Sequence, residues 1–294
     1  MIKKAILSTF IFLALHGILV MVRPPHTSGQ HQWQDNIIKA QRFIYDENDA
    51  SYDVIVGSSL SGRLVMDRLP HMYNLSFGGL TIFDGLNILA HKETVPQRIF
   101  IEMNVVWKKE DEGFTSSINQ PILYYLRKMF PSLRDEYEPI GLLGDRIIPI
   151  ITNRMTSYMQ KKETANDLSV EKEKHNAFFT RMLNIQIESY TQKLDLKALD
   201  ESFKNLKLYV NELERRNAHV IFYEMPVNQK LCYLPLATSI REKFHEYFPV
   251  TKYSYIYAPD CSEYETMDGL HLGNEEAVKY TNYFKSQISQ LSIF

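Results

Sequence analysis

Two short segments near opposite ends of the chain carry residue types suited to nucleophilic catalysis. In the first, Ser59 ends a Gly-Ser-Ser turn that follows the apolar run 54–56. In the second, Asp268 precedes His271 by three residues. A serine hydroxyl becomes a nucleophile when a base removes its proton, and a histidine oriented by a carboxylate is a common base. The sequence therefore predicts that Ser59, His271 and Asp268 act as nucleophile, base and orienting acid.

Further residues offer hydrogen-bond donors for the negative charge that develops in such a reaction. Gly79 ends the segment 74–79, which begins within a predicted strand, and Asn104 lies at the end of another. We expect the backbone N–H groups of Ser59 and Gly79 and the side chain of Asn104 to form an oxyanion hole. Taken singly, these residues are also ordinary turn residues. Their joint position near the ends of predicted strands favours a site.

The elements that must position these residues alternate between strand and helix. Short apolar runs bounded by turn residues predict strands at 53–62 (with the serine turn), 72–76, 98–106, 219–227 and 253–257. Apolar residues at helical spacing predict helices at 80–91, 121–129, 144–160, 199–216, 239–247 and 274–291. Because this alternation implies parallel crossovers, we expect an α/β fold: a parallel sheet of about five strands, helices on both faces, and a helical insertion at about 110–200.

The N-terminus has the pattern of a membrane anchor or a signal peptide. Lys3 and Lys4 precede the mostly apolar run 5–22, and such basic residues hold the N-terminus in the cytoplasm. The run does not end in the small residues of a cleavage site, which favours an uncleaved single-pass anchor; a buried helix is the alternative. We expect an anchor or signal at 1–23, a linker or stalk at 24–50 and an extracytoplasmic domain (periplasmic or cell-surface) at 51–294. Within the linker, we expect a short amphipathic helix at 37–45.

Composition narrows the function classes. The chain has 294 residues, a net charge of -2 and 45% hydrophobic residues, which suits a sizeable core and gives no basic patch for nucleic acid. The two cysteines, Cys232 and Cys261, either form one disulfide or remain two buried thiols. No His, Cys or Asp cluster has the spacing of zinc ligands, so we expect neither a metal nor a cofactor.

The chemical segments together resemble the SGNH (GDSL-like) hydrolase superfamily. The family's Gly-Asp-Ser block corresponds to 57–59, with Ser58 at the Asp position, and its Asp-x-x-His block to 268–271. Its Asn-x-x-x-x-Gly block corresponds to 74–79. The third block, Gly-x-Asn-Asp, is poorly kept, because Asn104 lacks both the glycine two residues before it and the acid after it.

The resemblance covers about residues 50–110 and 215–290 and implies an SGNH-like three-layer fold with a Ser-His-Asp site. The Gly-Ser-Ser block, the anchor and the long insertion are similar to one branch of the family. These are extracytoplasmic proteins that work beside membrane-bound O-acyltransferases in decorating surface polysaccharides, such as teichoic acid D-alanine transfer and alginate acetylation proteins. The resemblance thus implies an acyl-serine intermediate, a glycan or other acylated substrate and a membrane-bound O-acyltransferase partner.

Two classes of function remain open from the sequence. The first is an enzyme, either an acyltransferase or an acylesterase, including a simple GDSL-type esterase or lipase. Transferase and esterase share the acyl-serine and differ in whether a sugar hydroxyl or water resolves it. The second is a catalytically inactive interaction subunit with the same fold, which the degraded third block favours and the retention of Ser59, Asp268 and His271 opposes.

Overall fold

The computed structural model describes residues 2–22, 32–45, 52–138, 167–192 and 195–291. The chain divides into two compact units: the first comprises Met1–Asp46 and Ser117–Asp167, and the second Glu47–Ser116 and Leu168–Phe294. The division expected from the sequence was different, because it placed residues 117–167 in the main domain and treated 24–50 as a linker. The predicted helix at 144–160 lies outside the described residues.

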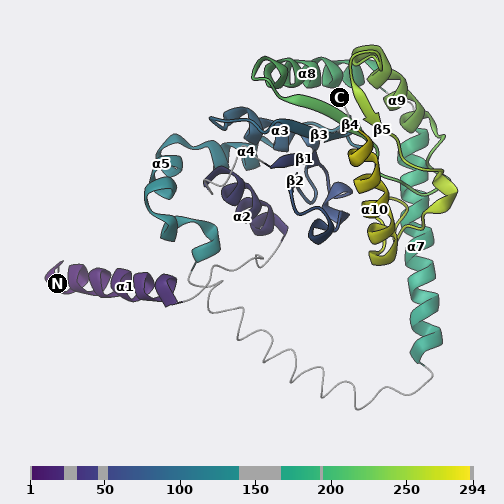
Figure 1. Ribbon diagram of the computed structural model, residues 1–294. Helices are drawn as coiled ribbons and strands as arrows, with labels where there is room; N and C mark the ends of the chain where they lie inside the picture. Colours follow the sequence, from purple (N-terminus) through teal and green to yellow (C-terminus); the bar gives the residue numbers. More distant parts are fainter. Residues whose placement is uncertain (1, 23–31, 46–51, 139–166, 193–194, 292–294) are drawn as a thin grey trace. The chain divides into compact units, whose positions relative to one another are not determined.

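The second unit is built on a five-stranded, all-parallel sheet with the order β2-β1-β3-β4-β5 (Figure 1). The strands are β1 (Asp53–Gly57), β2 (Met72–Ser76), β3 (Arg98–Glu102), β4 (His219–Tyr223) and β5 (Ser254–Ile256). The α/β class, the parallel sheet and the flanking helices expected from the sequence are therefore confirmed. The expected strand at 98–106 is shorter, and Asn104 lies beyond its end.

The order of the strands creates one place where ligands commonly bind. The chain runs from β1 outward to β2 and then returns to place β3 on the other side of β1. Crevices at the carboxyl ends of strands, beside such a reversal, are the usual ligand sites of open α/β sheets. Ser59 follows β1 and Asn104 follows β3, so both candidates lie at this reversal.

Helices cover both faces of the sheet because neighbouring strand residues point to opposite sides. The Phe222 ring lies 5.1 Å from that of Phe244, which in turn lies 4.9 Å from that of Phe203. On the other face, the Tyr223 ring lies 5.0 Å from that of Phe284. The helices of this unit are α3 (Ile82–His91), α7 (Asp167–Thr191), α8 (Leu196–Arg215), α9 (Pro235–Tyr247) and α10 (Asn274–Leu291), with the 3-10 helices η1 (Ser61–Arg63), η2 (Met66–Arg68) and η6 (Cys261–Glu263).

The first unit contains α1 (Ile2–Val22), α2 (Gln32–Tyr45), α5 (Pro121–Met129), η3 (Pro131–Leu133) and η4 (Asp135–Tyr137), and α4 (Glu112–Asn119) crosses the boundary between the units. The expected linker thus holds a packed helix. Arg42 of α2 pairs with Glu136 at 2.7 Å, and the Tyr45 ring lies 5.6 Å from that of Tyr124. The polar composition of the segment suggested a stalk, whereas α2 buries both apolar and polar side chains, among them Ile38, Phe43 and Gln41.

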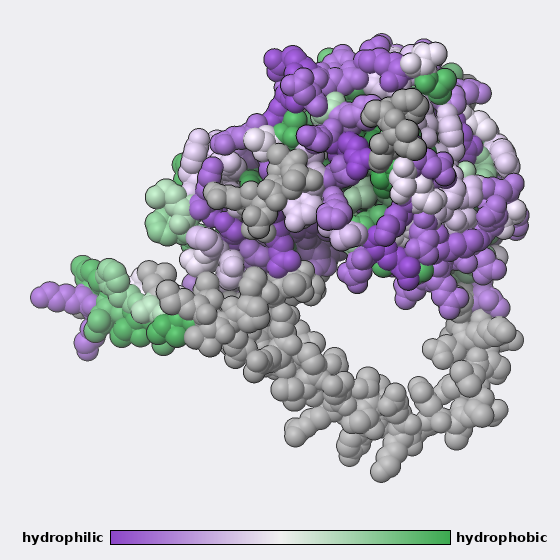
Figure 2. Space-filling view, viewed as in Figure 1, coloured by the Kyte–Doolittle hydropathy of each residue, from purple (hydrophilic) through white to green (hydrophobic). Residues whose placement is uncertain are grey.

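Apolar side chains are exposed in both parts of this unit. Figure 2 shows a hydrophobic stretch along α1, whose exposed large residues are Ile2, Ile6, Leu7, Phe10, Ile11, Phe12, Leu15 and Ile18. On α5, η3 and the residue between them the exposed ones are Ile122, Tyr125, Leu126, Met129, Phe130 and Leu133. In the part of the chain that the structure describes, no helix combines the length and the hydropathy needed to cross a membrane.

Candidate active site

The structure brings Ser59, His271 and Asp268 into one hydrogen-bonded chain. The Ser59 hydroxyl lies 2.8 Å from Nε2 of His271, and Nδ1 of His271 lies 2.7 Å from Oδ2 of Asp268. An N–H on Nδ1 donates to the carboxylate and leaves the lone pair of Nε2 to accept the hydroxyl proton. Side-chain accessibilities of 27% for His271 and 21% for Asp268 leave the group open to a ligand from solvent.

The carboxylate of Asp268 is held by its own loop. Its Oδ1 accepts the backbone N–H of His271 at 2.8 Å and that of Leu270 at 3.0 Å. Burial acts to raise the pKa of Asp268, but the hydrogen bonds from the His271 ring and from these two N–H groups outweigh it and lower the pKa to about 2. Asp268 is therefore ionised at neutral pH.

A clamp of hydrogen bonds joins the segment that follows Ser59 to the segment that follows His271. Arg63, four residues after Ser59, donates from Nε to the Leu272 carbonyl at 2.9 Å and from its terminal nitrogen to Asn274 at 2.8 Å. The Val65 N–H donates to the Thr281 hydroxyl of α10 at 3.0 Å. These contacts fix the serine turn against the histidine loop.

The histidine loop is closed by a narrow turn. Thr266 and Leu272 form an antiparallel bridge, and the Met267 N–H donates to the His271 carbonyl at 2.8 Å. Gly269 has a φ of +96°, and a side chain there would approach Leu183 of α7 to 3.0 Å. The positive φ favours glycine at 269, and any other residue would also have to displace the Leu183 side chain. The loop is thus held by α7 as well as by its own hydrogen bonds.

Gly79 lies in the turn that follows β2, beside the Ser59 turn that follows β1. The register pairs Gly57 with Ser76, so the Ser59 and Gly79 turns leave adjacent strands at the same level. Gly79 has a φ of +74°, and the Leu80 N–H donates to the Phe77 carbonyl at 3.4 Å. Within the described residues, no protein acceptor takes the backbone N–H of Ser59 or of Gly79. Both groups remain candidates for an oxyanion hole.

Asn104 has a different environment from the one expected. Its Nδ2 donates to the Met225 carbonyl at 2.9 Å, and its Oδ1 accepts the Met225 N–H at 2.8 Å. The buried side chain therefore links the segments that follow β3 and β4. One Nδ2 hydrogen is not used in this pair, so a role as an oxyanion donor stays a prediction.

Two other polar side chains support the serine turn from within the fold. Asn74 of β2 donates to the Ser61 carbonyl at 2.9 Å. Glu102, at the end of β3, is completely buried and accepts hydrogen bonds from Ser58 and Ser61. Burial raises the pKa of Glu102, and the hydrogen bonds from Ser61 and Ser58 oppose that rise. An acid ending the apolar run 99–101 was the only sequence signal for this contact.

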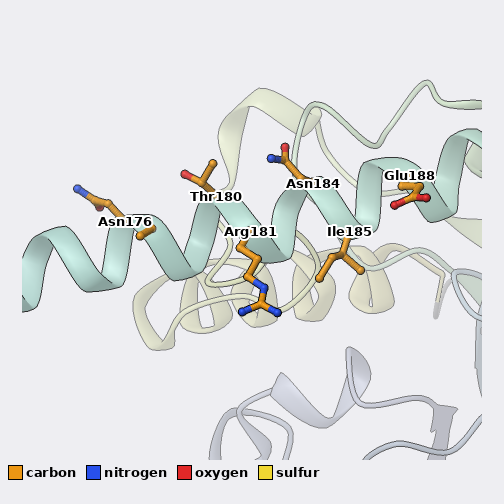
Figure 3. Close-up of a pocket in the computed structure, with 7 residues that line it drawn as sticks. Asn176, Thr180, Arg181, Asn184, Ile185 and Glu188 are labelled. Atoms are coloured by element: carbon orange, nitrogen blue, oxygen red, sulfur yellow. The ribbon is translucent and has the colours of Figure 1, made fainter.

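Two hollows lie at the surface of the second unit. One runs along α7, where Asn176, Thr180, Asn184 and Glu188 follow at four-residue spacing and Arg181 projects from another side of the helix (Figure 3). A second hollow is lined by Asn176 and Phe179 of α7 and by residues 228–229, 261–262 and 264–266. None of Ser59, Asp268 and His271 lines either hollow.

Cys232 and Cys261 form a disulfide, which decides the alternative that the sequence left open. It joins the segment after β4 to η6, seven residues before Asp268. Among the described residues, no group of three or more His, Cys, Asp or Glu side chains is placed to hold a metal ion.

Comparison with known proteins adds no identification. No protein-family model matches the sequence, and a search of curated proteins finds no significant match.

Proposed function

We propose that this protein transfers or removes an acyl group through an acyl-serine intermediate on Ser59. The observation that carries the proposal is the chain of two hydrogen bonds from Ser59 through His271 to Asp268, at 2.8 and 2.7 Å. These three groups stand 212 and three residues apart along the sequence. A contact of this geometry between a hydroxyl, an imidazole and an ionised carboxylate is what nucleophilic catalysis by serine requires.

In the proposed reaction, Ser59 Oγ attacks the carbonyl carbon of an ester while His271 Nε2 takes the hydroxyl proton. The carbonyl π electrons move to oxygen, where the backbone N–H groups of Ser59 and Gly79 donate to the oxyanion. When the intermediate collapses, the bond to the leaving alcohol breaks and that alcohol takes the proton from Nε2. Asp268 keeps the imidazole in the reactive tautomer throughout.

The acyl-serine is resolved by a second hydroxyl, whose proton passes to His271 and then to the released Ser59 oxygen. Water as this acceptor gives an esterase, and a sugar hydroxyl gives a transferase. The resemblance noted above favours a cell-surface polysaccharide as acceptor and a membrane-bound O-acyltransferase as partner. The partial exposure of His271 and Asp268 is compatible with an acceptor as large as a glycan chain.

We also propose that the first unit attaches the protein to a membrane, with the site on the extracytoplasmic side. Lys3 and Lys4 precede α1, whose large apolar residues are exposed. In the same unit, Ile122 and Met129 of α5 are 74% and 70% exposed. Exposed apolar surface of this kind is costly in water and typical of contact with lipid or with another protein.

The alternative is an inactive interaction subunit. The observation that favours it is the pairing of Asn104 with the Met225 backbone, because a donor used in this way contributes less to an oxyanion hole. The two functions differ in one measurable property, which is the reactivity of Ser59.

The test treats the full chain in detergent micelles with a serine-directed fluorophosphonate and with a short-chain aryl acetate. We expect labelling at Ser59, none in Ser59→Ala, and a loss of about 10²–10⁴-fold in His271→Ala, because proton transfer contributes that much to such reactions. Slow release of acetate favours a transferase that awaits its acceptor, and fast turnover an esterase. A folded protein that is never labelled, with or without a membrane fraction, would favour the inactive subunit.

A further inference from the structure

The carboxylate of Glu102 lies directly behind the turn that carries Ser59. Its Oε2 accepts the Ser58 N–H at 2.8 Å and the Ser61 N–H at 3.3 Å. The Ser58 hydroxyl lies 2.8 Å from Oε1, and the Ser61 hydroxyl donates to Oε2. One buried side chain therefore binds the residue before Ser59 and a residue two positions after it.

The neighbours of this network set the direction of its hydrogen bonds. The Leu60 N–H donates to the Ser58 hydroxyl at 3.2 Å, and the Tyr223 hydroxyl donates to the Ser61 hydroxyl. Because each serine oxygen accepts from its neighbour, its own hydrogen is directed at Glu102. Both oxygens of the carboxylate act as acceptors here. An amide of the same shape cannot replace them, because it has one acceptor oxygen and an NH₂ group that donates.

The space around the carboxylate is equally specific. A methyl group on Gly57 would lie 2.5 Å from the Ser61 side chain and 2.7 Å from Oε2 of Glu102. Glycine at 57 therefore makes room for the contact between the turn and the acid. Glu102 is also paired in register with Tyr223, so both ends of the network stand on the rigid sheet.

We propose that Glu102 is a positioning residue that holds the Ser59 turn in the conformation in which the Ser59 hydroxyl faces His271. The inference rests on the proposed function, since it assigns Glu102 an effect on Ser59 reactivity. Glu102 acts through Ser58 and Ser61 and has no contact with the reacting atoms. When the turn is loosened, Ser59 Oγ spends less time within proton-transfer distance of Nε2, and small displacements of this kind slow catalysis strongly.

A matched control exists at the other end of the same two strands. Asp53 begins β1 and forms two hydrogen bonds with Arg98 of β3, at 3.0 and 2.6 Å. Its side chain is 13% accessible. Asp53→Asn therefore makes the same carboxylate-to-amide change between the same two strands, β1 and β3. The change lies at the amino ends of these strands, whereas the site lies at their carboxyl ends. It removes structural stabilisation without touching the serine turn.

The experiment compares the full-length wild type, Glu102→Gln and Asp53→Asn in detergent, each shown to be folded by near-ultraviolet circular dichroism. We expect Glu102→Gln to lower the second-order rate of fluorophosphonate labelling at Ser59 by about 10–100-fold and to speed amide hydrogen exchange at Ser58 and Ser61. Asp53→Asn should leave both quantities within about twofold of wild type, since the effect is local. If Glu102→Gln does not fold, Ser58→Ala replaces it. This variant removes one hydrogen bond to the Glu102 carboxylate, and it should also slow labelling.

The outcomes separate the two proposals. Suppose that the wild type is labelled and that folded Glu102→Gln is labelled at the same rate. This result would overturn the positioning role, whatever the change in stability. The same holds for Ser58→Ala where that variant replaces Glu102→Gln. Equal slowing in Asp53→Asn would also overturn it, because a general loss of stability would then explain the effect. A wild type that is not labelled refutes the proposed function, and the exchange rates at Ser58 and Ser61 then decide by themselves whether Glu102 holds the turn.

Discussion

Replacement of Asp268 by asparagine changes the hydrogen bonding of the site in a way that the structure specifies. One carboxylate oxygen accepts two backbone N–H groups, from Leu270 and His271, and the other accepts Nδ1–H of His271. The amide of Asn has one acceptor atom, and two backbone donors compete for it against one ring donor. We expect the NH₂ group to face the imidazole and to force the tautomer whose proton is on Nε2.

That tautomer presents an N–H, rather than a lone pair, to the Ser59 hydroxyl. The expected loss of labelling at Ser59 is about 10³–10⁴-fold, the size of effect that a wrong tautomer produces in serine proteases. Asp260→Asn is the matched control, because Asp260 lies in the same region and accepts the Ser262 N–H at 2.8 Å without contacting His271. It should label at a rate close to that of wild type.

The same substitution has a predictable effect on stability. The pKa of Asp268 falls from its ordinary 3.8 to about 2 in the folded protein. This drop corresponds to about 2 kcal/mol, which solvent screening of the partly exposed carboxylate reduces to about 1 kcal/mol. A carboxyl whose pKa is lowered by folding stabilises the protein above its unfolded pKa, and that contribution disappears as the pH falls through the folded pKa.

We therefore expect wild type to exceed Asp268→Asn in free energy of unfolding by about 1 kcal/mol at pH 7, with the difference shrinking between about pH 4 and pH 2. Denaturant titrations at several pH values measure it. Labelling of Asp268→Asn at the wild-type rate would refute the assignment of Asp268 as the orienting acid. A stability difference that is as large at pH 2 as at pH 7 would refute the electrostatic argument.

Two further predictions test other parts of the molecule. Reduction of the disulfide, or the double change Cys232→Ser and Cys261→Ser, should lower the free energy of unfolding by about 3–4 kcal/mol, because the cross-link closes a loop with a sequence separation of 29; equal denaturation midpoints with and without reductant would contradict this. In full-length Ile122→Trp reconstituted in vesicles, brominated acyl chains should quench the fluorescence of the new tryptophan. Leu208→Trp is the control, because Leu208 is 69% exposed on α8, and its fluorescence should not be quenched. Absence of quenching at position 122 would mean that α5 faces water or a protein partner instead of lipid.

Several features of the molecule were predictable from local patterns. The strands at 53–57 and 72–76 have the apolar runs and turn residues that such patterns describe, and α3 and α10 have helical periodicity. A parallel sheet followed from their alternation. Since carboxyl ends of parallel strands share one edge, Ser59 and Gly79 were expected at the same edge, and the register places them there.

Other features were wrong or undecided because they depend on what a residue meets after folding. A short helix was expected at 37–45 within the linker 24–50, whereas α2 begins earlier, at Gln32, and buries Ile38 and Phe43. The pairing of Cys232 with Cys261 was left open, and the structure decides it. Asn104 was assigned to an oxyanion hole by its position after a strand, whereas the adjacent Met225 backbone takes two of its hydrogen bonds.

The local elements and the residue types available for chemistry follow from the amino-acid sequence alone, because periodicity and turn propensity are properties of neighbouring residues. The contact between Ser59 and His271 follows from the fold, since a contact between residues so far apart depends on the order of the strands and on the Arg63 clamp. The fold also decides that Glu102 binds the serine turn. A carboxylate at the end of an apolar run is either buried, where it accepts hydrogen bonds from the protein, or exposed to solvent. Which of the two occurs depends on the side chains that pack around it.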